Sequence, residues 1–236
     1  MAYKTVPLNE SQVGKYVDID GDGIPEGVIF ADLAVGDSGQ WGDKDFKEKY
    51  KIQMIKDGLR DYIVVGEYDD QINGKQEILA PILDGEDRFY IMALNNVSKD
   101  QSKDKYSWYN SAYSEKILDY EKATSEIFGS GKQNTLNMIE KWNKEDYGAQ
   151  DSDDMWSLIQ KQVDDGWFVP SRGEWTAFAG QLGITKSNYS SKGLSGWYWS
   201  SSQSGTNSAY YISLDYGYVY DYYVIDYYYV RLAATF

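Results

Sequence analysis

Short apolar runs, separated by breaks rich in glycine and aspartate, make up the first part of the chain to about residue 95. Runs of this length, with β-branched and aromatic side chains and turn residues on both sides, are typical of strands. We therefore predict strands at residues 15–19, 27–31, 50–55, 61–65, 77–83 and 88–94. Residues 98–105 are polar, and we predict an exposed loop there.

The middle of the chain changes to helical spacing. In one segment Leu136, Ile139 and Trp142 share the predicted apolar side. In another, Ser171 is followed three positions later by Glu174, which is the pattern of a capping box. The acidic run at residues 151–154 favours a helix start, because carboxylates suit the positive end of the helix dipole. The predicted helices are residues 114–127, 135–144, 153–163 and 171–182.

After residue 183 the chain becomes rich in serine, glycine and tyrosine and reads as extended to its end. These patterns predict an α+β fold with short strands, a few helices and long irregular loops. At 236 residues with 42% hydrophobic side chains, the chain can bury a sizeable core. We divide it into a β-rich N-terminal part, residues 1–105, and a C-terminal part, residues 106–236.

Composition removes several classes of function. A net charge of −14 without any cluster of lysine and arginine argues against nucleic acid and anionic membranes as partners. The absence of cysteine and histidine removes thiolate chemistry, the commonest general base and the commonest transition-metal ligand. No carboxylate pair stands in a recognisable catalytic arrangement, so we expect a binding protein and not an enzyme. Nothing approaches the ~18 apolar residues of a membrane span, and residues 1–15 lack the apolar run of a signal peptide.

Tyrosine is concentrated near the end of the chain. Ten of the twenty-two residues from Ser208 to Tyr229 are tyrosine, and residues 193–230 contain no lysine, arginine or glutamate. Tyrosine gives a large contact area at a low cost in side-chain entropy, as in evolved binding surfaces. Only one face of a strand can be buried, so several of these rings must face water together. A contiguous aromatic surface predicts an interaction site; core packing and a contact between copies of the chain are the alternatives.

A second candidate site lies in the segment from Asp18 to Glu26. Asp18, Asp20 and Asp22 alternate before glycine, and Glu26 follows at the ninth position of a calcium-type loop. The twelfth position holds Ile29, where such a loop has a bidentate glutamate. Both a structural calcium and a metal-free Asx/Gly turn fit this pattern.

Several tryptophans lie close to predicted turns. Large rings in such places usually pin loops to a core, so we assign Trp167, Trp175, Trp197 and Trp199 to the scaffold.

Four motifs in a fixed order resemble a known family. They are Gly131-Lys132-Gln133-Asn134-Thr135, the segment from Gly166 to Trp175, Trp199-Ser200-Ser201-Ser202, and Tyr229-Val230-Arg231-Leu232-Ala233. Together they resemble the variable proteins of diversity-generating retroelements. The resemblance covers the chain from about residue 110 to the C-terminus. Residues 20–36 are also similar to the start of related domains from gut bacteria and their phages. The resemblance implies a C-type lectin fold of the formylglycine-generating-enzyme type, without that enzyme's chemistry, which needs cysteines.

The resemblance also implies a source for the tyrosine bias. In that family a reverse transcriptase copies a template with errors at adenines, which scatters AAC-type codons while the scaffold codons stay fixed. The resemblance places the diversified region at about residues 187–229. The implied ligand-binding positions are Ser195, Gly196, Ser204, Ser208, Tyr210, Tyr211, Ser213, Asp215, Tyr216, Tyr220, Asp221, Tyr222, Tyr223, Ile225, Asp226 and Tyr227. The implied fixed frame is Trp197, Trp199, Ser200, Ser201, Gly217, Val230 and Arg231.

From these positions we expect a macromolecular ligand, a protein on a cell surface, with a neutral to basic contact patch opposite the aspartates. The alternative is a calcium-dependent glycan-binding lectin, although the sequence has no Glu-Pro-Asn or Trp-Asn-Asp motif. For location we expect a phage virion or a bacterial cell surface, reached without an N-terminal signal peptide, and otherwise the cytoplasm.

Overall fold

The computed structural model describes residues 3–82, 84–100, 102–109, 124–144 and 153–236. Its strands are β1 (Tyr16–Val17), β2 (Gly27–Asp32), β3 (Asp37–Trp41), β4 (Glu48–Ile52), β5 (Tyr62–Asp70), β6 (Gly74–Pro81), β7 (Phe89–Ala93), β8 (Tyr106–Ser107), β9 (Trp197–Gly205), β10 (Ser208–Ser213), β11 (Tyr218–Tyr223), β12 (Tyr227–Tyr228) and β13 (Ala233–Thr235). Its helices are α1 (Gly131–Asn143), α2 (Met155–Leu158), α3 (Gln160–Asp164), α4 (Arg172–Gln181) and the 3-10 turn η3 (Ser190–Lys192). The fold is therefore α+β, as predicted.

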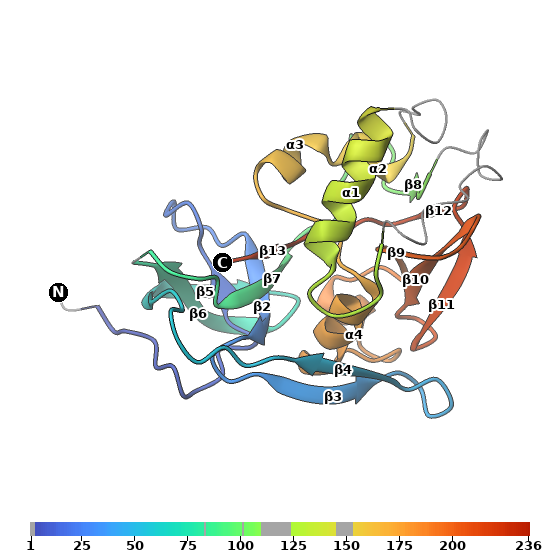
Figure 1. Cartoon of the computed structure of the whole chain (residues 1–236). Helices are drawn as coiled ribbons and strands as arrows, with labels where there is room; N and C mark the ends of the chain where they lie inside the picture. Colours follow the sequence, from blue (N-terminus) through green and yellow to red (C-terminus); the bar gives the residue numbers. More distant parts are fainter. Residues whose placement is uncertain (1–2, 83, 101, 110–123, 145–152) are drawn as a thin grey trace.

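The largest sheet has six strands in the order β13-β7-β2-β1-β6-β5, and it lies on the left in Figure 1. All its pairs are antiparallel except β1 with β6. Every residue of β2 is buried, which explains why this strand reads as a nearly continuous apolar run. Because β13 pairs with β7, the two parts divided at residue 105 share this sheet.

Three smaller sheets complete the strands. The sheet β11-β10-β9 lies on the right in Figure 1, and β3 with β4 forms a hairpin below α4. The short strands β8 and β12 pair with each other. The end of the chain thus runs from the three-stranded sheet through β12 back to β13 in the six-stranded sheet.

Helix α4 lies at the centre of the main apolar core. Its Phe178 ring lies 5.8 Å from Phe30 of β2, and its Trp175 ring lies 4.8 Å from Tyr198 of β9. A second core gathers Trp108, Trp156 and Trp199 with aromatic and aliphatic side chains of β10 and β12. The two cores hold the three-stranded sheet from both of its faces.

The predicted capping box of α4 is confirmed. The Ser171 hydroxyl accepts from the Glu174 amide, and the Glu174 carboxylate accepts from the Ser171 amide at 2.6 Å. The same carboxylate, fully buried, also accepts from the amides of Gly129 and Gly131 at 3.1 and 3.2 Å. Gly131 is required there, because a β-carbon would lie 2.1 Å from a Glu174 oxygen. One carboxylate therefore joins the starts of α1 and α4.

The other predicted elements fit less closely. Residues 27–31 lie in β2 as predicted, the strand predicted at 88–94 is β7 without its two end residues, and 98–100 with 102–105 form a loop outside the named strands and helices. The strands at 15–19, 50–55, 61–65 and 77–83 overlap β1, β4, β5 and β6 with different bounds, and residue 83 lies outside the described residues. Strand β3 was not predicted, because its residues are mostly polar and exposed.

The helix predictions need three corrections. Residues 114–123 lie outside the described residues, and residues 124–127 are not helical. Helix α1 begins four residues earlier than predicted and buries Asn134, Thr135 and Met138, while Leu136 is exposed. The segment 153–163 is divided into α2 and α3 at Ile159. Of the acidic run, residues 151 and 152 lie outside the described residues, and Asp154 caps α2 by accepting from the Ser157 amide at 2.8 Å.

Among the described helices, none combines the length and the apolar character needed to cross a bilayer.

Candidate functional site

The three-stranded sheet decides which tyrosines face water. Paired residues on neighbouring antiparallel strands share a face, and the register pairs Tyr222 with Ala209, Tyr220 with Tyr211, and Tyr218 with Ser213. The register continues from Tyr211 to Trp199 and from Ser213 to Trp197 on β9. These eight residues therefore lie on one face of the sheet.

This face is covered near β9 and open along β11. The ring of Tyr228 lies 4.4 Å from Trp199 and 4.8 Å from Tyr211, so both side chains are buried beneath it. On β11, Tyr220 and Tyr222 remain 54% and 46% exposed. Strand β11 has β10 as its one partner among the described strands, so its rings stand at the edge of the sheet.

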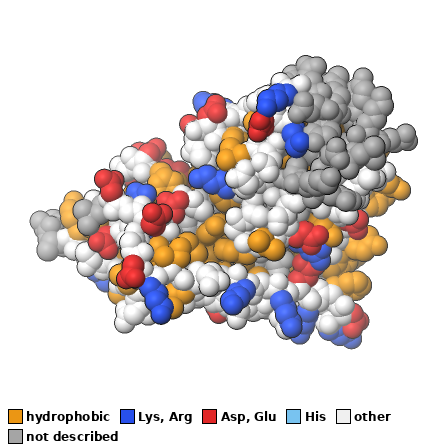
Figure 2. Space-filling view, in the orientation of Figure 1, with side chains coloured by type: hydrophobic (Ala, Val, Ile, Leu, Met, Phe, Trp, Pro, Cys, Tyr) orange, Lys and Arg blue, Asp and Glu red, His pale blue; other side chains and the backbone are white. Residues whose placement is uncertain are grey.

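Neighbouring aromatic side chains extend the open part. We name as the aromatic surface Trp197, Tyr216, Tyr218, Tyr220 and Tyr222, together with Tyr223, which pairs with Ser208 on the other face but meets Tyr222 edge to face at the end of β11. Tyr216 stacks on Tyr218 with ring centres 5.8 Å apart, and Tyr218 meets Tyr220 edge to face at 6.0 Å. In Figure 2 apolar side chains gather at the edge of the molecule where Figure 1 places β11.

Buried hydrogen bonds connect the residues that lie beneath the aromatic surface. Ser200 donates to the Tyr210 carbonyl at 2.7 Å, and Ser201 accepts from the Asn134 amide at 3.1 Å. The Arg231 guanidinium, almost wholly buried, donates to Asn96 at 2.8 Å and to the carbonyls of β7 and the residue after it. Trp199, Gly217 and Val230 of the proposed frame are likewise buried.

Two residues predicted to bind ligand lie inside the protein. Tyr211 is 8% exposed beneath Tyr228, and Ser213 is fully buried, with its hydroxyl donating to Asp215 at 2.7 Å. Neither belongs to a surface, because both share the covered part of the sheet face. Conversely Trp197, assigned to the scaffold, is 40% exposed and belongs to the aromatic surface.

Other predicted positions face the opposite side of the sheet. Tyr210 lies over the Arg172 guanidinium, which is 4.2 Å from the ring centre. Its cross-strand partner Asp221 accepts from the Ser204 hydroxyl at 3.0 Å, and Ser204 and Ser208 share a hydrogen bond. This group does not share the aromatic surface.

The remaining positions lie around the two ends of the sheet. Ser195 and Gly196 are half-buried, and a β-carbon at Gly196 would lie 3.3 Å from Asp215. The Asp215 carboxylate accepts from the indole of Trp197 at 2.8 Å, which fixes the orientation of this ring within the aromatic surface. At the other end Ile225 is 39% exposed, while burial raises the pKa of Asp226.

Lysines and a phenylalanine from outside residues 193–230 reach this region. The Lys103 ammonium lies 5.2 Å from the ring centre of Tyr227, which is 49% exposed, and Lys105 lies 5.1 Å from Tyr229. Phe46, 54% exposed at the β3–β4 turn, lies 5.4 Å from Tyr218. Sequence reasoning missed these residues, because they come from distant loops without a motif of their own. The expected neutral to basic patch on the partner stays a prediction.

The acidic cluster is assembled as a compact loop between β1 and β2. One carboxylate oxygen each from Asp18, Asp20, Asp22 and Glu26 falls within 4.8 Å of the others, so the four could hold a cation. The same groups cap main-chain amides: Asp18 accepts from Gly21 and Gly23 at 2.7 and 2.9 Å. Burial raises the pKa of Glu26, which accepts from the Ile19 amide. The Asx/Gly turn is therefore present, with Asp20 and Asp22 each accepting from the amide two residues on, and a bound calcium stays a prediction.

The acidic cluster and the aromatic surface belong to different sheets, on opposite sides of Figure 1. A cation held by Asp18 and its neighbours would not lie beside the exposed rings. The arrangement thus gives no support to a lectin mechanism in which calcium and an aromatic ring hold one sugar together.

Comparison with known proteins gives no match: no family model, curated protein or solved structure matches the chain.

Proposed function

We propose that the protein binds a macromolecular partner, a protein on a cell surface, through the aromatic surface. The observation that carries this proposal is the row of rings along β11, open to solvent on a frame held by buried hydrogen bonds. Phenol groups combine apolar contact area with a hydroxyl that donates and accepts, and a rigid frame reduces the entropy lost on binding.

The aromatic surface also supports the proposed relationship to retroelement variable proteins and their C-type lectin fold. Tyr216, Tyr220, Tyr222 and Tyr223 can change without removing a core contact, because each is about half exposed. The adjacent DNA tests this relationship. We expect a second copy of the 3′ coding segment that differs only at adenines, beside a reverse-transcriptase gene; a locus without both would contradict it.

Replacing both Tyr222 and Tyr223 by serine tests the proposed binding. The two rings lie 5.4 Å apart and are 46% and 52% exposed, so the Tyr222→Ser/Tyr223→Ser variant loses contact area and keeps its core. We expect fluorescently labelled variant protein to bind at least about tenfold more weakly to bacterial cells that the wild type labels in flow cytometry. The matched control is Tyr3→Ser, at a tyrosine 69% exposed far from β11. Equal labelling by the double variant and the control would contradict the proposal.

A further inference from the structure

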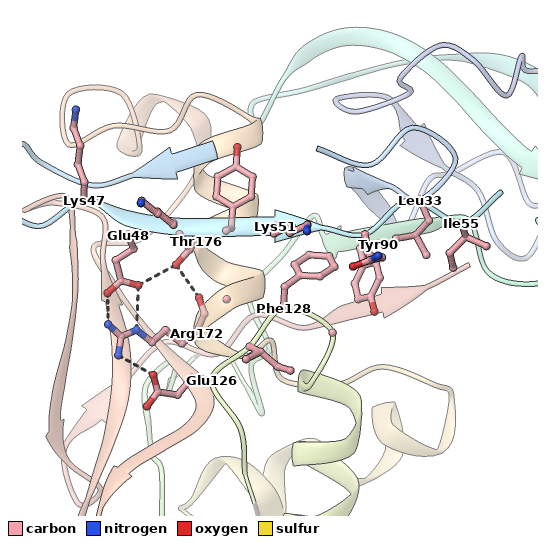
Figure 3. Close-up of a pocket in the computed structure, with 16 residues that line it drawn as sticks. Leu33, Lys47, Glu48, Lys51, Ile55, Tyr90, Glu126, Phe128, Arg172 and Thr176 are labelled. Carbon is pink, nitrogen blue, oxygen red and sulfur yellow. Dashed lines mark hydrogen bonds and ion pairs between the residues drawn. The ribbon is translucent and has the colours of Figure 1, made fainter. Parts of the chain in front are cut away.

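The hairpin of β3 and β4 borders an open cleft of about 850 Å³ (Figure 3). Within the described residues β4 pairs with β3 alone, so one of its edges has no strand beside it. Five consecutive residues of this region, Lys47 to Lys51, line the cleft. Side chains of successive strand residues point to opposite faces, so a cleft lined by all five runs along the edge of the strand. An open edge can pair with another extended chain.

The far side of the cleft is apolar. Phe128 and Tyr90 lie with their ring centres 4.7 Å apart, and Leu33 and Ile55 continue this wall. Ile127, also in the lining, is 69% exposed. Such a wall can receive apolar side chains from a segment lying beside β4.

The near side of the cleft is basic. Lys47, Lys49 and Lys51 alternate along the strand, so they share its solvent face, and all three are exposed. None of them makes an ion pair with another described residue. This row of unpaired cations stands out in a chain with a net charge of −14.

The acidic groups in the lining do not cancel these lysines. The Arg172 guanidinium donates through Nε to Glu48 at 3.0 Å and through Nη1 to Glu126 at 3.1 Å (Figure 3). Arg172 also forms an ion pair with Glu48 through Nη2. Both carboxylates are thus paired with Arg172 at one end of the cleft, so they do not neutralise Lys47, Lys49 and Lys51.

We propose that this cleft binds an extended acidic segment of a partner protein, which adds as a strand to the free edge of β4. Main-chain hydrogen bonds to the edge would hold the segment, and its side chains would alternate between two environments. Those on the lysine face would be acidic, since opposite charges on neighbouring strands attract. Those on the other face would be apolar and would lie against Phe128 and Tyr90.

This inference is independent of the proposed function. It uses β4 and the wall at residues 126–129, and none of the rings of the aromatic surface lines the cleft. Loss of one binding activity therefore leaves the other unchanged.

A peptide of alternating glutamate and valine, about seven residues long, is the probe. We expect saturable binding to the full chain by fluorescence anisotropy, weakening as salt is added. The Lys49→Glu/Lys51→Glu variant should weaken binding at least about tenfold. The matched control, Lys132→Glu/Lys161→Glu, changes two exposed lysines on α1 and α3 and should bind as the wild type does. No binding by the wild type, or equal binding by both double variants, would overturn the proposal.

Two further peptides separate strand addition from simple charge attraction. One carries N-methyl groups that remove the main-chain donors along one edge, and the other has the same composition with its glutamates grouped together. Strand addition predicts at least about tenfold weaker binding of each. If either peptide, or an unstructured polyglutamate chain, binds as well as the alternating peptide, the lysines act as a general anion-binding row and the proposal is wrong.

Discussion

Replacing Arg88 by methionine is expected to lower the free energy of unfolding by about 3–5 kcal/mol. Arg88 and Asp32 are both fully buried, and the guanidinium donates to both oxygens of the carboxylate at 2.9 Å. The same guanidinium donates to the Pro7 carbonyl at 2.9 Å, which holds the N-terminal segment against the six-stranded sheet. Without it, the fully buried Asp32 carboxylate keeps, among the described residues, the amide donors of Gln12 and Ala34 and no cation.

Urea denaturation of three variants tests this account. The Asp32→Asn/Arg88→Met variant removes both charges, and we expect it to recover part of the stability lost by Arg88→Met. Lys75→Met, which breaks the exposed pair of Lys75 with Glu67, should lower the unfolding free energy far less than Arg88→Met does. An Arg88→Met variant as stable as the Lys75→Met control would show that the buried pair does not anchor the sheet.

The second large effect is a pH dependence that originates at Glu174. Burial raises the pKa of this carboxyl from its ordinary 4.5 to about 7, although the amides of Ser171, Gly131 and Gly129 oppose the shift. The folded state then binds its proton more tightly than the unfolded state does. The contribution to stability is therefore fully present below pH 4.5 and is lost as the pH rises through about 7.

Comparison with Glu174→Gln isolates this titration, because the other carboxyl groups are common to both proteins. As the pH falls from 8 to 5, the free energy of unfolding of the wild type should rise by roughly 2–3 kcal/mol relative to that of the variant. Unfolding free energies measured by urea across this range give the difference directly. A constant difference would mean that the three amide donors outweigh burial and keep the pKa of Glu174 near its ordinary value.

Local signals made some elements predictable from the sequence. The capping box of α4 depends on Ser171 and Glu174, which are three residues apart, so its pattern is visible without the rest of the fold. The start of α1 was missed because its buried residues are polar: Asn134 bonds to Ser125 and Ser201, and Thr135 to the Val169 amide. Apolar spacing cannot find a helix face that is buried through such distant partners.

The same limit applies to the candidate site. Alternation along β11 predicts that Tyr218, Tyr220 and Tyr222 share a face. It does not show which part of that face is covered, because the cover, Tyr228, comes from β12 and pairs with β8 near residue 106. The buried place of Tyr211, which the resemblance assigns to ligand binding, therefore follows only from the fold.

Site-specific photo-crosslinking tests the central claim most directly. A benzophenone amino acid placed at Tyr222, on the aromatic surface, should form a covalent adduct with a cell-surface protein when the chain is bound to cells and irradiated. The same group at Tyr3, an exposed tyrosine near the N-terminus, should form no such adduct. Adducts at Tyr222 alone would support the aromatic surface as the binding site; equal adducts at both positions, or adducts at Tyr3 alone, would contradict it.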